Sequence, residues 1–300
     1  MGLRGAQPAA LASVREGSLE MSIARIAVLT VLAMIAFAGN SLLCRAALKA
    51  PAIDAASFTT IRMVSGALVL WLIVRLTRRS HSGDGNWRSA LALFGYAAAF
   101  SFAYGSLPAA SGALVLFGAV QLTMIGHGLW SGERFQAVQV VGLLMAIAGL
   151  VSLLLPGLSA PPLAGALLMV CAGLSWGVYS LRAKGQGDPT RVTAGNFLRT
   201  VPMALAVSLV MHDQVSISTA GFWWAVSSGA LASALGYAIW YTALPALKAT
   251  NAAVVQLSVP VIAALGAVVF LDEQLSLRLW LASPVILGGI GLVIAGGRRA

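Results

Sequence analysis

The residues best suited to chemistry in this 300-residue chain are aromatic rings and side-chain amides, not acids, bases or nucleophiles. Tyr96, Phe100 and Tyr104 are spaced i, i+4, i+8, so a helix would present all three on one face. A tyrosine ring offers a large apolar surface for stacking and a hydroxyl for hydrogen bonding. Such a stripe either lines a ligand cavity or lies in the interfacial belt of a membrane, and the spacing leaves both alternatives open.

A second stripe with the same spacing follows 137 residues later, with Ser233, Tyr237 and Tyr241 at the corresponding positions. Amides within apolar runs are expected to point inward, since an amide facing lipid would lack a hydrogen-bond partner. They could bind the amine and carboxylate of a zwitterion or bridge helices. The candidate substrate-binding residues are Asn40, Tyr96, Phe100, Tyr104, Gln121, Trp176, Tyr179, Tyr237, Tyr241 and Gln256.

A search for catalytic motifs finds no Walker A loop and no HExxH sequence. The two cysteines, Cys44 and Cys171, lack CxxC spacing and are too few for a metal site or a disulfide framework. We therefore expect no catalytic residues, no metal and no cofactor, and we do not expect an enzyme.

Arg62 and Arg199 are the charged residues that fall inside apolar runs, where an arginine at the helix centre costs about 2.5–3.5 kcal/mol. Each could attract a substrate carboxylate, or could snorkel to the interface or cap neighbouring carbonyls. The 137-residue shift superposes the two arginines, which would place them on opposite sides of a membrane. This symmetry argues against one shared clamp and favours a structural role for both.

Composition identifies the elements that must position these residues. Apolar residues make up 59% of the chain and charged residues only 9%, whereas a soluble domain has about 25% charged residues. The apolar runs are continuous and about as long as the roughly 20 residues that a membrane-spanning helix needs. They predict an all-α integral membrane protein with ten transmembrane helices, near 24–44, 56–75, 88–107, 111–131, 137–155, 162–182, 192–211, 220–244, 250–271 and 279–297.

The basic residues predict the orientation of these helices. Lys and Arg gather in the tails and in alternate loops, while the opposite side holds only Arg45, Lys49 and Arg278. The positive-inside rule then places both termini in the cytoplasm. The net charge of +10 is explained by this pattern, so we expect membrane lipid and no nucleic acid as an anionic partner.

The two halves of the chain also share a short motif. The 137-residue shift aligns AYGSLPA at 103–109 with WYTALPA at 240–246, in addition to the arginines and the stripes. Because each half holds five predicted helices, an odd number, the second half must enter the membrane upside down. The predicted organisation is a cytoplasmic tail (1–22), a first five-helix repeat (23–157), a second, inverted repeat (158–297) and a cytoplasmic C-terminus (298–300).

These repeats, with an arginine in the second helix and an aromatic-x-x-Leu-Pro end to the third, resemble the drug/metabolite transporter superfamily, and its EamA-type branch most of all. Within it the chain is similar to YddG-type exporters of aromatic and other amino acids. The resemblance implies a multi-pass protein of the bacterial inner membrane, with a central cavity lined by the first, third, fourth, sixth, eighth and ninth helices. We expect it to act as a monomer on small-molecule substrates.

The expected function is export of amino acids, aromatic and other small amphipathic ones, by alternating access. All nine carboxylates lie in tails, loops or span ends, so we expect no proton or sodium coupling; His127 is the one titratable histidine within a run. One alternative is an exporter of multiple drugs or cationic aromatic metabolites, in which the tyrosines would supply cation–π contacts. A membrane enzyme or a lipid-interacting scaffold is the alternative of another class. Pro202 and Pro260 are the expected bending points.

Overall fold

The computed structural model describes residues 21–49, 52–77, 83–107, 109–132, 134–154, 163–183, 186–271 and 277–297. Within these ranges the regular structure is helical, apart from one isolated antiparallel bridge between Ile53 and Ile217. The helical segments are α2 (Ile23–Lys49), α3 (Ala55–Thr77), α4 (Trp87–Tyr104), α5 (Ala109–Trp130), α6 (Ala137–Leu154), α7 (Leu163–Arg182), α8 (Pro189–Val210), η1 (His212–Gln214), α9 (Thr219–Ser227), η2 (Ser228–Leu235), α10 (Gly236–Ala243), η3 (Leu244–Ala246), α11 (Ala249–Gln256), α12 (Ser258–Leu271) and α13 (Leu277–Gly297).

The long helices fall where the apolar runs predict them, and their outer surfaces are strongly apolar. In the described part of the chain, six helices are long and apolar enough to cross a membrane: Ile23–Leu48, Ala55–Thr77, Leu163–Arg182, Pro189–Val210, Thr219–Ala246 and Asn251–Phe270. Shorter apolar helices cover Val115–Gly128, Ala137–Gly149 and Pro284–Val293. Trp130, Leu122 and Phe270 are among many large apolar side chains left exposed, as expected for a surface in contact with lipid. The chain is a multi-pass membrane protein.

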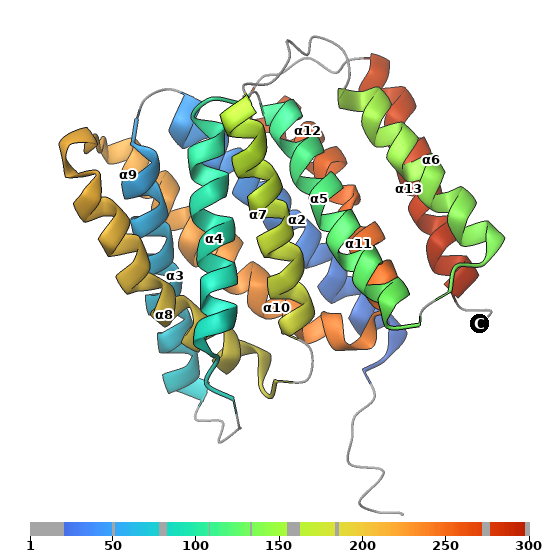
Figure 1. Ribbon diagram of the computed structural model, residues 1–300, viewed down its shortest axis with the longest axis horizontal. Coiled ribbons are helices and arrows are strands. Elements are labelled where there is room, and N and C mark those ends of the chain that lie inside the picture. The colour runs from blue at the N-terminus through green and yellow to red at the C-terminus, as the bar shows by residue number, and fades with distance from the viewer. Residues whose placement is uncertain are drawn as a thin grey trace, which may run out of the picture.

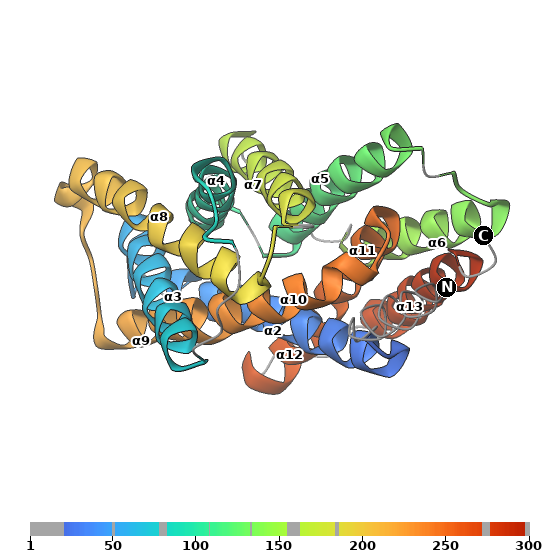
Figure 2. The same ribbon diagram turned by 90° about the horizontal axis from the view of Figure 1, so that it is seen from below.

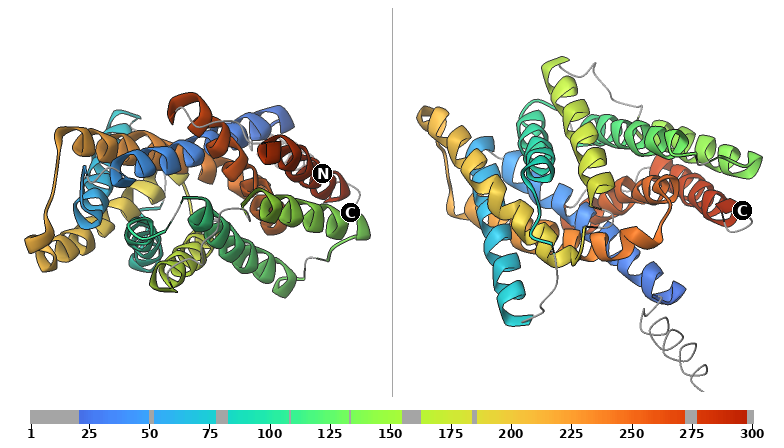
Figure 3. Two further views of the ribbon diagram at one scale, coloured as in Figure 1. Left: turned by 90° about the horizontal axis from the view of Figure 1, so that it is seen from above. Right: turned by 60° about the horizontal axis from the view of Figure 1, so that its bottom comes forward.

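The helices pack across the two halves of the chain. The largest helix–helix interfaces pair α6 with α13, α4 with α7, α3 with α8, and α5 with α7. Figure 1 shows α6 and α13 side by side at one end of the molecule and α3, α8 and α9 at the other. Seen from below, α2 and α10 lie between α12 and the α4–α7 pair (Figure 2). Figure 3 gives the same grouping from two further directions. The halves therefore form one helical body.

Polar N-caps fix where several helices begin. A carboxylate or amide oxygen accepts the backbone N–H three residues later: Asp54 from Ser57 at the start of α3, Asn86 from Ser89 at α4, and Asp188 from Arg191 at α8. These bonds satisfy N–H groups that have no partner within the helix. Asn86 also donates to Gln186 across 2.9 Å, which joins the start of α4 to the segment between α7 and α8.

Two long helical segments are interrupted where they face the interior. A π-helical stretch, η2, separates α9 from α10. Leu257 separates α11 from α12 three residues before Pro260, which has no N–H to donate to the carbonyl of Gln256. By contrast, α8 continues through Pro202 without interruption. Of the two expected bending points, a helix break therefore occurs only near Pro260.

Candidate functional site

A narrow cavity lies where helices from both halves converge. Its wall is mostly aromatic and aliphatic, with a few polar groups. The lining residues are Phe37, Asn40 and Ser41 of α2, Tyr96 and Phe100 of α4, Leu116, Phe117 and Val120 of α5, Trp176 of α7, Tyr237 of α10, Gln256 of α11 and Val259 of α12. The free volume is about 30 Å³. One water molecule needs at least about 10–15 Å³, so a larger ligand must displace side chains to enter.

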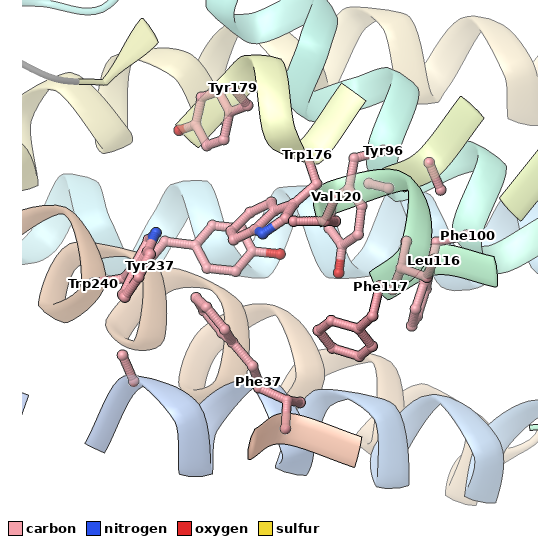
Figure 4. Packing of buried hydrophobic residues seen from close by; sticks show 14 of the residues in the cluster. Phe37, Tyr96, Phe100, Leu116, Phe117, Val120, Trp176, Tyr179, Tyr237 and Trp240 are labelled. Carbon is pink, nitrogen blue, oxygen red and sulfur yellow. The ribbon is translucent and has the colours of Figure 1, made fainter. Parts of the chain in front are cut away.

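The aromatic rings of the cavity gather around the Trp176 indole. Its ring centroid lies 4.8 Å from that of Tyr237, 5.0 Å from that of Tyr96 and 5.2 Å from that of Phe37. Figure 4 shows these rings converging from α2, α4, α7 and α10. Tilted and edge-to-face pairs at such distances are the favoured arrangements of aromatic side chains. The two stripes thus meet at one aromatic centre.

The amides near the cavity bridge helices. Gln256 Oε1 accepts a 2.7 Å hydrogen bond from Trp176 Nε1, which joins α11 to α7. Asn40 Oδ1 accepts a 2.6 Å hydrogen bond from Ser228 Oγ, and Asn40 Nδ2 donates a 3.5 Å hydrogen bond to Tyr96 Oη. Of the two roles open to these amides, bridging is the one that these contacts display, and it also fixes the position of the Trp176 ring.

The structure brings most of the sequence-predicted residues to the cavity. Those in its lining are Asn40, Tyr96, Phe100, Trp176, Tyr237 and Gln256. Outside the lining, Tyr104 packs edge-on against Phe100 at 4.7 Å and Tyr179 against Tyr241 at 5.2 Å. Gln121 donates a 2.6 Å bond to the carbonyl of Ala253. Of these residues, Tyr104, Tyr179 and Tyr241 pack against rings of the wall.

Several lining residues escape sequence reasoning because they are apolar side chains within apolar runs. Phe37 has the one usable signal, since it lies three residues before Asn40 and thus on the same helix face. Leu116, Phe117, Val120 and Val259 have no such signal, because their residue types are the ones that any membrane helix contains.

Arg62 lies next to the cavity, and its contacts are neither of the two that symmetry favours, snorkelling and the capping of carbonyls. Its side chain is fully buried. Nε donates to Ser233 Oγ at 2.9 Å, and Nη2 donates to Tyr237 Oη at 2.8 Å. Cζ lies 5.4 Å from the ring centroid of Tyr96 and 5.8 Å from that of Phe100. Nη1 is buried without a hydrogen-bond partner among the described residues. The expectation that Arg62 snorkels or caps carbonyls is therefore wrong.

Arg199, by contrast, behaves as a capping residue. Its Nη1 donates to the backbone carbonyls of Asp84 at 2.7 Å and Gly195 at 2.8 Å, near the start of α8. Arg191 forms an ion pair with the carboxylate of Asp84 at 2.7 Å in the same region. The expected carbonyl cap is confirmed for Arg199, and it joins α8 to the segment before α4.

The fold and the cavity together indicate the class of protein. It is an all-helical, multi-pass membrane protein whose two halves meet at an internal aromatic cavity. The chain belongs to the EamA-like transporter family, whose model matches residues 24–155 and again residues 163–295. The double match confirms the two repeats and places the chain in the drug/metabolite transporter superfamily.

Three relatives and one solved structure are similar to this chain. The uncharacterized protein PA1977 of Pseudomonas aeruginosa is 56% identical over 90% of this chain and 95% of its own length. A "probable amino-acid metabolite efflux pump" of Escherichia coli is 26% identical over 69% of this chain and 77% of its own. The uncharacterized transporter YoaV of Bacillus subtilis is 22% identical over 78% of this chain and 85% of its own length. A crystal structure with 22% identity superposes with a TM-score of 0.76, covering 93% of this chain and 100% of that one, and so shares the fold.

Proposed function

We propose that this protein exports amino acids, aromatic and other small amphipathic ones, across the bacterial inner membrane by alternating access. The observation that carries the proposal is the aromatic cavity at the junction of the two halves, with Trp176 at its centre. Aromatic rings would stack on an apolar side chain, while nearby hydroxyls would meet a polar head group. The name of the Escherichia coli relative, an amino-acid metabolite efflux pump, supports the same substrate class.

The proposed transporter has ten transmembrane helices in two inverted repeats, with both termini in the cytoplasm, and works as a monomer. Support comes from helices at the positions of the apolar runs, from the double family match and from the asymmetry of Lys and Arg. In this class of carrier, the substrate site lies at the interface of the repeats and each side opens in turn.

We further propose that transport needs no proton or sodium coupling. The described carboxylates, Asp54, Asp84, Asp188 and Asp213, all lie outside the long helices. Carriers driven by these ions commonly place an acid inside the membrane. His127 lies in the last turn of α5, exposed and 3.4 Å from Ser131 Oγ, away from the cavity.

Export of cationic aromatic compounds is less well supported. The guanidinium of Arg62 lies against two rings of the cavity wall and would repel a cation there. Membership in a transporter family likewise favours transport over an enzyme or a scaffold.

Uptake into liposomes that contain the purified protein tests the proposal. A panel of labelled amino acids is offered with no pH or sodium gradient. We expect phenylalanine and other small amphipathic amino acids to move down their own gradients, and empty liposomes to take up none above leakage. Failure of every amino acid would contradict the substrate class, whereas a strict need for one ion gradient would contradict only the uncoupled mechanism.

A further inference from the structure

We infer that Arg62 is the residue that binds the carboxylate of the transported molecule. The inference rests on the proposed function and deepens it, because it assigns the recognition of the substrate's charge to one side chain beside the cavity.

The charge of Arg62 has no counter-ion among the described residues. A guanidinium stays protonated in proteins, and this one is fully buried. The ion pairs within the described part of the chain lie elsewhere, between Arg191 and Asp84 and between His212 and Asp213. A buried charge without a counter-ion is strongly unfavourable. An anion that binds beside Arg62 would therefore replace missing electrostatic stabilisation.

Arg62 uses only some of its hydrogen-bond donors within the described part of the chain. Nε and Nη2 form one edge of the guanidinium, and the hydroxyls of Ser233 and Tyr237 occupy that edge. Nη1 has no hydrogen-bond partner among the described residues. The edge formed by Nη1 and the second N–H of Nη2 matches the two oxygens of a carboxylate, the geometry in which arginine binds carboxylates most strongly. The two hydroxyls hold the guanidinium in place for this contact.

Arg62 is also placed where a bound substrate could reach it. Tyr96, Phe100 and Tyr237 each line the cavity and each contact Arg62, so the guanidinium lies directly behind the cavity wall. With a free volume of about 30 Å³, a ligand must displace rings as it enters. Rotation of Tyr96 or Phe100 would open the path to Nη1. The substrate's carboxylate would then lie at Arg62, and its side chain would lie near Trp176.

The test compares phenylalanine with phenylalanine amide, which has the same ring and amine but no carboxylate. We expect the wild-type protein in nanodiscs to bind phenylalanine roughly 10- to 100-fold more tightly, as expected for a charge-assisted hydrogen bond. Arg62→Gln should abolish this preference, and Arg62→Lys should retain part of it. Arg199→Gln is the matched control at the equivalent repeat position and should keep the full preference. An unchanged preference in Arg62→Gln overturns the inference.

A second measurement needs no variant, in case Arg62→Gln does not fold. Labelled phenylalanine bound to the wild-type protein is competed with 3-phenylpropanoate, which has only the carboxylate, and with phenethylamine, which has only the amine. We expect the acid to compete and the amine to fail. Competition by the amine as strong as that by the acid would overturn the inference.

The two proposals can fail separately. If the wild-type protein moves no amino acid in liposomes, the proposed function fails. If it moves phenylalanine while Arg62→Gln still discriminates against the amide, the function stands and the role of Arg62 is wrong.

Discussion

Arg62 and Arg199 lie at equivalent positions of the two repeats, yet they have opposite environments. Arg62 is fully buried among side-chain hydroxyls and aromatic rings beside the cavity. Arg199 is partly exposed and donates to the backbone carbonyls of Asp84, before α4, and of Gly195, one turn earlier in α8. One residue type at one position of a repeat therefore has two roles, and the neighbouring side chains decide which.

The neighbours differ in a way that explains the outcome. Ser233 and Tyr237, which accept from Arg62, correspond to Tyr96 and Phe100 in the first stripe. Phe100 has no hydroxyl, so the first stripe offers an arginine fewer acceptors. Arg62 also packs on the rings of Tyr96 and Phe100, and thus lies between both stripes. Arg199 instead finds its acceptors at Asp84 and Gly195.

The largest expected effect comes from Tyr237→Phe, which gives the second stripe the residue that the first stripe has at the corresponding position, Phe100. Arg62 then loses a 2.8 Å charge-assisted hydrogen bond while the ring remains. We expect the free energy of unfolding to fall by about 1.5–3 kcal/mol, measured by thermal or denaturant unfolding in detergent.

Tyr179→Phe is the matched control, because Tyr179 is equally buried and its hydroxyl accepts a 3.4 Å bond from the neutral Asn196 instead of one from a charged group. Its loss should be smaller, about 1 kcal/mol or less. Equal losses in the two variants would mean that Tyr237 gives Arg62 no special support.

The second change removes a ring from the first stripe. Phe100→Ala takes away a cavity-lining ring, whereas Tyr104→Ala removes the ring that packs behind it. A stacked aromatic pair contributes about 0.5–1.5 kcal/mol beyond burial, so the first variant should bind aromatic amino acids several-fold to about tenfold more weakly. Threonine should be affected less, since it has no ring to stack.

Uptake of both substrates by each variant in liposomes measures this preference. Tyr104→Ala should alter yield or stability more than preference. If Phe100→Ala also leaves the ratio of phenylalanine to threonine transport unchanged, Phe100 serves only packing.

Much of the fold could be predicted because the residue types directly show which segments are apolar enough to form membrane helices. Continuous apolar runs predicted where α2 to α13 lie, and the shift between Arg62 and Arg199 predicted the repeats. The end of α11 near Pro260 follows from the missing N–H of proline. The uninterrupted passage of α8 through Pro202 does not, since it depends on tertiary packing.

The site could be predicted only in part. The stripe spacing found Tyr96, Phe100 and Tyr237, because one helix face carries distinctive residues. Leu116 and Val259 could not be found, because the same apolar residue types occur on helix faces that contact lipid, a neighbouring helix or a cavity. The burial of Arg62 was missed because repeat symmetry describes backbone positions and not side-chain partners.

A third change tests Arg199, the arginine of the second repeat. Arg199→Gln removes two bonds to carbonyls at a partly exposed position. Water can replace lost partners there, so we expect a loss of about 1 kcal/mol or less in the free energy of unfolding. Transport should be unchanged. A large transport defect in well-folded Arg199→Gln, measured in liposomes, would show that the two arginines share a role after all.

The smallest expected effect concerns the caps of the two arginine-bearing helices. Asp54 caps α3 and also accepts from the N–H of Ser216 at 3.0 Å, whereas the Asp188 carboxylate accepts from Arg191 N–H at the start of α8. Partial burial acts to raise the pKa of Asp54, but the bonds from Ser57 and Ser216 outweigh it and lower the pKa below its ordinary 3.8. The ionised form therefore stabilises the fold above that pH, and the contribution is lost as the pH falls through the lowered pKa.

Asp54→Asn should cost about 0.3–1 kcal/mol near neutral pH, the usual range for a charge at a helix N-terminus. Unfolding of both proteins from pH 7 to pH 3 should show curves that converge only below about pH 4; a constant gap down to pH 3 would mean that the Asp54 charge contributes nothing.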